Sequence, residues 1–138
     1  MFIKSEIMRL LIYIILIQAG LIAGLSSHAM AQEATAKINK AIKAGDAGTL
    51  SEHFNSTLDI SIPGTDQTMS KSHATQVMKN FFKANPPQSY VENHSGSSRE
   101  ATKYIIGTYK SAITYKTYIL LKEKEGKYLI VQLQFEAD

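Results

Sequence analysis

Apolar and polar side chains alternate along the last third of the chain, the pattern of β-strands that bury one face. Strands are predicted over residues 101–111 and 113–123, and a third strand follows the turn at Glu125-Gly126. In the second strand, one face is expected to carry Ile113, Tyr115, Thr117, Ile119 and Leu121. In the last strand, one face is expected to carry Leu129, Val131, Leu133 and Phe135, and the other Tyr128, Ile130, Gln132 and Gln134.

Helical spacing marks two short segments before the middle of the chain. Residues 34–44 place alanine and isoleucine on one side and lysine on the other, and Gly45 supplies the stop. Asp46 is the expected N-cap of a second helix that reaches Phe54. We therefore expect a bent pair of helices at the start of the domain.

A hairpin and a long helix are predicted next. Residues 57–62 alternate as a half-buried strand, Pro63-Gly64 turns the chain, and residues 65–69 return as a second strand. Ser70 caps a helix that ends at Asn85-Pro86-Pro87, because proline cannot continue the backbone hydrogen bonding. Its core-facing stripe consists of Ala74, Val77, Met78, Phe81 and Phe82.

A strand over residues 89–95 and a loop over residues 96–100 complete the prediction. Strands that are segregated from helices indicate an α+β fold with helices against one face of an antiparallel sheet. Sequential strands joined by short turns indicate a meander of about five to six strands with three helices in the first half of the chain.

The first 31 residues have the three parts of a secretory signal peptide. Lys4 and Arg9 form the basic region, residues 10–25 form the apolar region, and Ala29-Met30-Ala31 is the small-residue cleavage site. We expect cleavage after Ala31, which leaves residues 32–138 as one periplasmic or secreted domain without a membrane segment. An uncleaved membrane anchor is the alternative, although a spanning helix usually needs about 20 apolar residues.

Composition removes several classes of function. The chain has no cysteine, which excludes disulfides, thiolate metal sites and cysteine nucleophiles. The formal net charge is only +3, and lysines are scattered among glutamates with no basic block. Nucleic-acid binding is therefore not expected, since it needs a basic face with interleaved aromatic side chains.

Several segments resemble a known family. Residues 40–54 resemble the opening of nuclear transport factor 2-like domains, in which a helix is followed by Gly-Asp and a short helix ending in Phe. Residues 58–64, 70–87 and 118–136 are similar to a family of small exported domains of unknown function from Bacteroidetes-type bacteria. The resemblance implies a curved antiparallel sheet wrapped around helices as a cone, with a cavity at its open end.

The resemblance does not select a function. It brings no catalytic residues, and relatives in the wider, cystatin-like superfamily include isomerases, epoxide hydrolases, cyclases and non-catalytic binding or dimerisation modules. Enzymes on this fold bury a carboxylate in the cone. Asp59 is the acid that best fits such a role, but it lies on the polar face of its strand and is expected to be exposed.

No metal or cofactor site is predicted. The histidines do not form a pair at ligand spacing, and no glycine-rich phosphate loop or nucleophile elbow is present. Tyrosines in the strands are instead the richer signal, because they combine apolar area with a hydroxyl group. Packing across the sheet is their ordinary role. The sharper hypothesis is a cavity or interface lined by Tyr104, Tyr109, Tyr115, Tyr118, Tyr128, Gln132 and Gln134.

These observations favour a non-catalytic domain that binds a small apolar ligand or a protein partner through the cone cavity or the sheet face. Two alternatives remain open: an isomerase- or cyclase-like enzyme that uses a cavity carboxylate, and a homodimerisation module.

Overall fold

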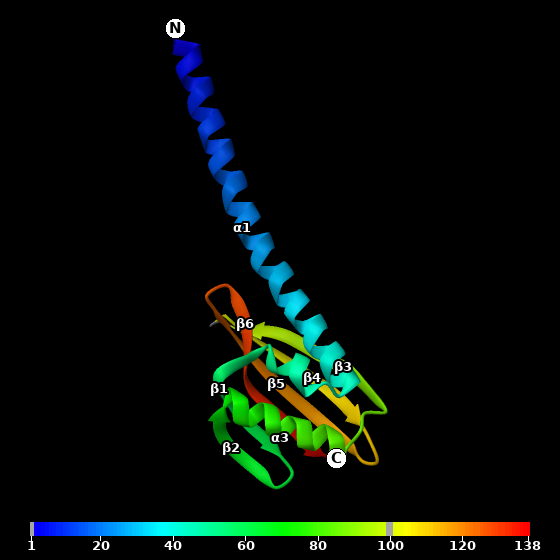
Figure 1. The fold of residues 1–138 in the computed structure, drawn as a ribbon. Coiled ribbons are helices and arrows are strands. Elements are labelled where there is room, and N and C mark those ends of the chain that lie inside the picture. Colours follow the sequence, from blue (N-terminus) through cyan, green and yellow to red (C-terminus); the bar gives the residue numbers. More distant parts are fainter. Residues whose placement is uncertain (1, 99–100) are drawn as a thin grey trace. The chain divides into compact units, whose positions relative to one another are not determined.

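The computed structural model describes residues 2–98 and 101–138, and it describes no side chain for Phe2 or for residues 18–27. The elements in order are α1 (Phe2–Ala44), α2 (Ala47–Ser51), β1 (Phe54–Ile62), β2 (Thr65–Ser70), α3 (Lys71–Ala84), β3 (Ser89–Ser98), β4 (Thr102–Lys110), β5 (Thr114–Lys124) and β6 (Lys127–Ala137) (Figure 1). The α+β class and a sheet of six strands are confirmed.

The contacts divide the chain into two units between Met30 and Ala31. The first unit is helical, and its described apolar side chains from Ile3 to Ile17 are exposed. Within the described part of the chain, no helix combines the length and the hydropathy of a membrane span. The remaining paragraphs concern the second unit, residues 31–138.

The bend between α1 and α2 is formed by the two residues expected from the sequence, Gly45 and Asp46. Gly45 ends α1 with a φ of +64°, the left-handed conformation that glycine adopts without a steric penalty. Asp46 caps α2 by accepting a hydrogen bond from the backbone N–H of Thr49 at 3.0 Å. The expectation that α2 reaches Phe54 is wrong, because Phe54 is already the first residue of β1. Its buried side chain still joins the core, although from a strand.

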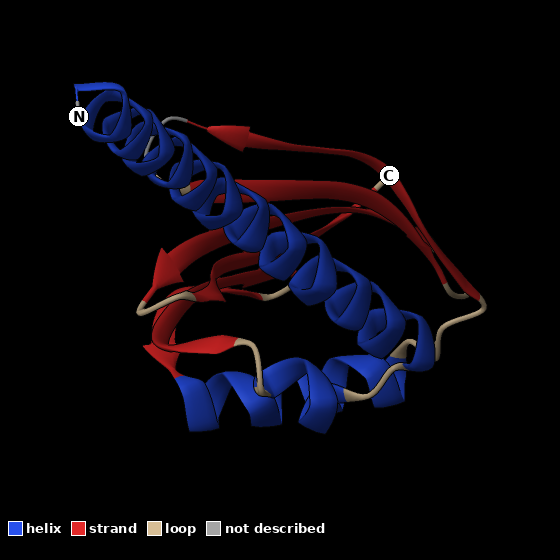
Figure 2. Ribbon diagram, turned by 90° about the horizontal axis from the view of Figure 1, so that it is seen from above, coloured by secondary structure: helices blue, strands red, loops and turns tan. Residues whose placement is uncertain are grey.

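The sheet has the strand order β2-β1-β6-β5-β4-β3. Strands β3 to β6 form the predicted antiparallel meander, and β1 pairs with β2 as a hairpin. The expectation of a wholly antiparallel sheet is wrong, because β1 runs parallel to β6. Helix α3 follows the hairpin and connects it to β3 across one side of the sheet (Figure 2). Because β3 forms the far edge of the meander, the hairpin pairs with the other edge strand, β6.

A β-bulge changes which side chains of β6 face the core. Leu120 pairs with Gln132, but the next residue of β5, Leu121, pairs with Ile130, so Val131 is an extra residue on β6. Leu133 and Phe135 are buried as predicted. Before the bulge the prediction is inverted: Ile130 is buried, whereas Leu129 and Val131 are half-buried on the opposite face.

Two further expectations are corrected. Ile113 is 51% exposed rather than part of the buried face, because it precedes the first residue of β5. Residues 96–98 of the expected loop belong to β3 and pair with β4, while Arg99 and Glu100 lie outside the described residues. The other members of the β5 core face, Tyr115, Thr117, Ile119 and Leu121, are buried.

Helix α3 is fixed to the sheet by aromatic packing and by hydrogen bonds at its end. The Phe81 ring lies 4.8 Å from Phe135 and 5.3 Å from Tyr115, measured between centroids. Where the helix ends, the Tyr109 hydroxyl donates to the Asn85 carbonyl oxygen at 2.5 Å. The Tyr115 hydroxyl donates to Asn85 Oδ1 at 2.8 Å. The last turn of α3 is thereby bonded to β4 and β5.

Replacing Asn85 by alanine should lower the free energy of unfolding by about 1–3 kcal/mol, because the buried Tyr115 hydroxyl loses its partner. Denaturant titration of the single and double variants measures this. Tyr115→Phe combined with Asn85→Ala should cost less than the sum of the two. Asn80→Ala, on the exposed side of the same helix, is the matched control. Strictly additive effects would contradict the proposed coupling.

Alkaline pH should destabilise the domain through Tyr109. Burial, aided by the neighbouring Tyr115, raises the pKa of Tyr109 to about 12, above the value of about 10 for an unfolded tyrosine. Between these values the folded state keeps a proton that the unfolded state releases, so the free energy of unfolding falls as pH rises. Denaturant midpoints from pH 8 to pH 11.5 should therefore fall less steeply in Tyr109→Phe. An unchanged slope in this variant would argue against this role.

Candidate functional site

The seven side chains singled out by the sequence fall on opposite faces of the sheet. We call the face that packs against the helices the inner face, and the opposite one the outer face. Tyr109 and Tyr115 are buried on the inner face, at 0% and 3% exposure, and Tyr128 packs against the same core. The half-buried side chains of Tyr104, Tyr118, Gln132 and Gln134 lie on the outer face. The structure therefore does not bring all seven into one site.

The outer face carries two rows of side chains that cross all six strands. One row pairs His94, Ile106, Tyr118, Gln134, Ser61 and Asp66 from β3 to β2. The other pairs Gly96, Tyr104, Leu120, Gln132, Asp59 and Thr68. Apolar and aromatic side chains occupy the middle of both rows, and carboxylates occur at the β1–β2 end.

Tyr104 is held in a fixed position on this face. Its hydroxyl lies 3.0 Å from His94 Nε2, and its ring covers Gly96 so closely that a Cβ there would lie 2.5 Å from the hydroxyl oxygen. Glycine at position 96 is therefore required for this packing. The sequence pattern places Gly96 in a loop, so the cross-strand contact with Tyr104 becomes visible only from the register of β3 and β4.

Asp59 is exposed on the outer face, as expected, and accepts a hydrogen bond from the Thr68 hydroxyl. Glu92, which is not among the residues singled out from the sequence, is a carboxylate on the inner face. The signal was available, because Glu92 stands two residues after the buried Tyr90 and so shares its face.

A small polar cluster surrounds Glu92 on the inner face. The Asn39 side chain of α1 donates from Nδ2 to Glu92 Oε2 at 2.5 Å. The buried Asn39 Oδ1 has no hydrogen-bond partner among the described residues. Burial raises the pKa of Tyr90, and its side-chain hydrogen bond with the buried Thr117 opposes this shift. Each unsatisfied buried group costs roughly 1–3 kcal/mol.

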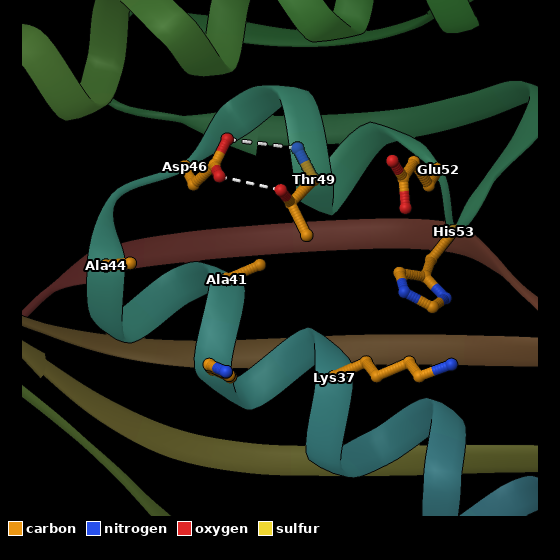
Figure 3. A pocket seen from close by; sticks show the side chains of 8 residues that line it. Lys37, Ala41, Ala44, Asp46, Thr49, Glu52 and His53 are labelled. Carbon is orange, nitrogen blue, oxygen red and sulfur yellow. Dashed lines mark hydrogen bonds between the residues drawn. The ribbon is translucent and has the colours of Figure 1, made fainter.

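A third feature is a groove of about 400 Å³ between the end of α1 and α2 (Figure 3). Ala41 and Ala44 form its apolar part, and Lys37 and His53 extend from opposite walls toward it. Lys37 Nζ is paired with Glu33 at 2.8 Å, and both Asp46 carboxylate oxygens are bonded to Thr49. Burial lowers the pKa of His53. Two charged groups of this groove, Lys37 and Asp46, therefore already have partners.

Within residues 2–98 and 101–138, no group of three or more His, Cys, Asp or Glu side chains is placed to hold a metal ion. Tyr109 and Tyr115 have a structural role, since their hydroxyls bond the end of α3. The outer face is the broadest arrangement of half-buried side chains that could bind a partner.

Comparison with solved structures supports the fold. A DUF4783 family protein from Bacteroides ovatus is 26% identical, with a TM-score of 0.71 over 75% of this chain and 94% of that one. Its counterpart from Bacteroides fragilis is 21% identical, with a TM-score of 0.70 over 74% and 96% of the two chains. A cystatin-like protein of unknown function from Nostoc punctiforme, 11% identical, has a TM-score of 0.63 over 80% and 90%.

Nuclear transport factor 2-like proteins are among the other structural neighbours, including one of unknown function from Shewanella baltica. No curated protein matches the chain. A family model described as a domain of unknown function, DUF4783, matches residues 35–136, which is most of the sequence. The chain therefore belongs to the DUF4783 family and has the nuclear transport factor 2-like, cystatin-like α+β fold.

Proposed function

We propose that this chain is an exported, non-catalytic binding domain that acts through the outer face of its sheet, and that its partner is a second copy of the chain. The observation that carries the proposal is the pair of rows across the outer face. Half-buried Ile106, Tyr118 and Leu120 lie at their centre, flanked by Gln132 and Gln134. Aromatic and apolar groups with few central charges are typical of the core of an interface.

Charge supports a second copy as the partner. Asp59 and Asp66 are exposed on β1 and β2, whereas Lys110, Lys116 and Lys122 are exposed on β4 and β5. A two-fold axis near the β6–β5 boundary turns the face onto itself. It brings β1 of one copy, which carries Asp59, over β4 of the other, which carries Lys110, so opposite charges occur on these facing strands.

The size of the face is adequate for a stable pair. Six strands about 4.8 Å apart and roughly nine residues long cover on the order of 700 Å². A standard interface buries about 800 Å² on each partner.

Packing on the inner face argues against an apolar ligand between the sheet and the helices, and so favours binding through the outer face. The central side chains of the inner face, including Ile105, Ile119 and Leu133, are fully buried against the helices. The non-catalytic part rests on the exposed Asp59 and on the structural use of Tyr109 and Tyr115. An isomerase- or cyclase-like reaction would need a carboxylate and a hydroxyl converging on open space.

Export is supported by the N-terminal residues. A basic region, an apolar region and Ala29-Met30-Ala31 occur in the order of a signal peptide. The division of the chain between Met30 and Ala31 falls within one residue of the expected cleavage site. The domain is therefore proposed to begin at Gln32.

Mass spectrometry of the exported protein should find Gln32 as the first residue. Ala29→Arg should abolish cleavage, because the small residue at this position is replaced, whereas Gln32→Asn should not. An N-terminus before Leu25, or release of Ala29→Arg at the normal site, would refute this part of the proposal.

Light scattering and sedimentation should show a dimer in the exported protein. Tyr118→Glu should weaken dimerisation at least 100-fold, because each interface contains the substitution twice, whereas Lys79→Glu on the exposed side of α3 should leave it unchanged. Lys110→Glu and Asp59→Lys should each weaken the dimer about tenfold, and the combined variant should recover part of the loss. A wild-type mass that stays monomeric at every concentration would dispose of the dimer.

A further inference from the structure

The groove between α1 and α2 has no role in the outer-face function proposed above. Its volume of about 400 Å³ is in the range of small-molecule sites, about 300–1,000 Å³. One wall is a single stripe along α1, made of residues at helical spacing: Lys37, Lys40, Ala41 and Ala44. The opposite wall follows the chain from the cap of α2 to the residue before β1: Asp46, Thr49, Glu52 and His53.

Two of the four charged side chains in the groove already have a partner. Glu33 holds Lys37 Nζ at 2.8 Å, and this hydrogen bond and the charge of Glu33 raise the pKa of Lys37. Both carboxylate oxygens of Asp46 accept hydrogen bonds from Thr49, and these bonds lower the pKa of Asp46. Lys37 and Asp46 would each have to give up a contact in order to bind a ligand.

The other two charges, on Lys40 and Glu52, have no such partner. In the part of the chain that the structure describes, neither side chain makes a hydrogen bond or an ion pair. Lys40 and Glu52 have opposite signs and belong to opposite walls of the groove. A ligand with a single charge would be attracted by one of them and repelled by the other. A ligand with both charges can bind to both.

His53 and two alanines supply the remaining chemistry of the groove. Burial lowers the pKa of His53 below the ordinary value of 6.5, so at pH 7 the ring is mostly neutral and offers one N–H donor and one acceptor. The ring extends toward the groove (Figure 3) and makes no hydrogen bond with any described residue. Ala41 and Ala44 contribute two methyl groups, which form an apolar surface on the α1 wall.

We propose that this groove is a binding site for a free α-amino acid with an apolar side chain. The carboxylate of the ligand accepts hydrogen bonds from the Lys40 ammonium group, and the ammonium group of the ligand donates to the Glu52 carboxylate. The apolar side chain of the ligand lies over Ala41 and Ala44. A peptide bond at either end of the ligand would remove one of its two charges, so the site favours a free amino acid over a peptide.

The test titrates the purified protein with L-leucine at pH 7 and follows the NMR signals of His53 and Ala41. Exposed ion pairs are weak, so we expect saturable shifts with a dissociation constant on the order of 1 mM and extend the titration to about 20 mM. L-Leucinamide lacks the carboxylate, and N-acetyl-L-leucine lacks the ammonium group. Each should bind about fivefold more weakly than L-leucine, because one ion pair is lost.

Two variants match each charge of the groove to one charge of the ligand. In Lys40→Gln, L-leucine and L-leucinamide should bind equally weakly, because the carboxylate has lost its partner. In Glu52→Gln, L-leucine and N-acetyl-L-leucine should become equal for the corresponding reason. Lys43→Gln, on the same helix but outside the groove, is the matched control and should bind L-leucine as the wild type does. All three side chains are exposed, so folding should not depend on them.

The proposal is overturned if L-leucine causes no saturable shift in the wild type. Equal binding of L-leucine and N-acetyl-L-leucine to the wild type overturns it as well, because the groove would then be a site for a simple carboxylate. A preference for L-leucine over L-leucinamide that persists in Lys40→Gln contradicts the assigned contact. The outer-face dimer is measured separately by light scattering, so failure of one proposal is distinguishable from failure of the other.

Discussion

The fold depends on the junction between the end of α3 and the central strands. Phe81 and Phe82 pack against Tyr109, Tyr115 and Phe135, and two tyrosine hydroxyls bond to Asn85. A short domain without disulfides must obtain its stability from its core, and this is where the helix and three strands share one aromatic cluster. The hydroxyls also give the cluster a single geometry, because rings alone could slide past one another.

Because of this junction, the two faces of the sheet have different roles. The inner face is used up by packing, apart from the few polar groups around Glu92. The outer face keeps side chains of mixed character that no helix covers in the second unit. A binding function is therefore better placed outside the sheet, and any chemistry of the interior is confined to one small polar cluster.

The sequence was sufficient for most elements because local signals determine them. Asp46 and Ser70 cap their helices, and Pro86-Pro87 follows the end of α3, all by interactions within a few residues. The fold family was also identifiable from such segments. The faces of β6 were not, since alternation assumes that no residue is inserted, and Val131 is inserted. The insertion is visible only against the partner strand.

The sites were harder to predict for the same reason. The parallel pairing of β1 with β6 unites Asp59 with Gln132, two residues that lie far apart in the sequence. Tyr109 and Tyr118 are both tyrosines in neighbouring strands, yet Tyr109 is buried in the core and Tyr118 lies on the outer face. Composition could identify tyrosine as the relevant residue type. It could not divide the tyrosines between two faces.

The bulge at Val131 has a consequence for how the length of this chain can vary. Ile130, Leu133 and Phe135 would still point inward if Val131 were deleted, because the strand would then alternate regularly. What would change is the bend, since a bulge increases the local twist of its strand. The pairing of β1 with β6 is also irregular at this point: Phe54 pairs with Ile130 and Asp59 pairs with Gln132, so five residues of β1 lie opposite two of β6. Asn55 and Val131 border an opening of about 350 Å³ there. A relative that is one residue shorter here would keep the same core under a straighter sheet.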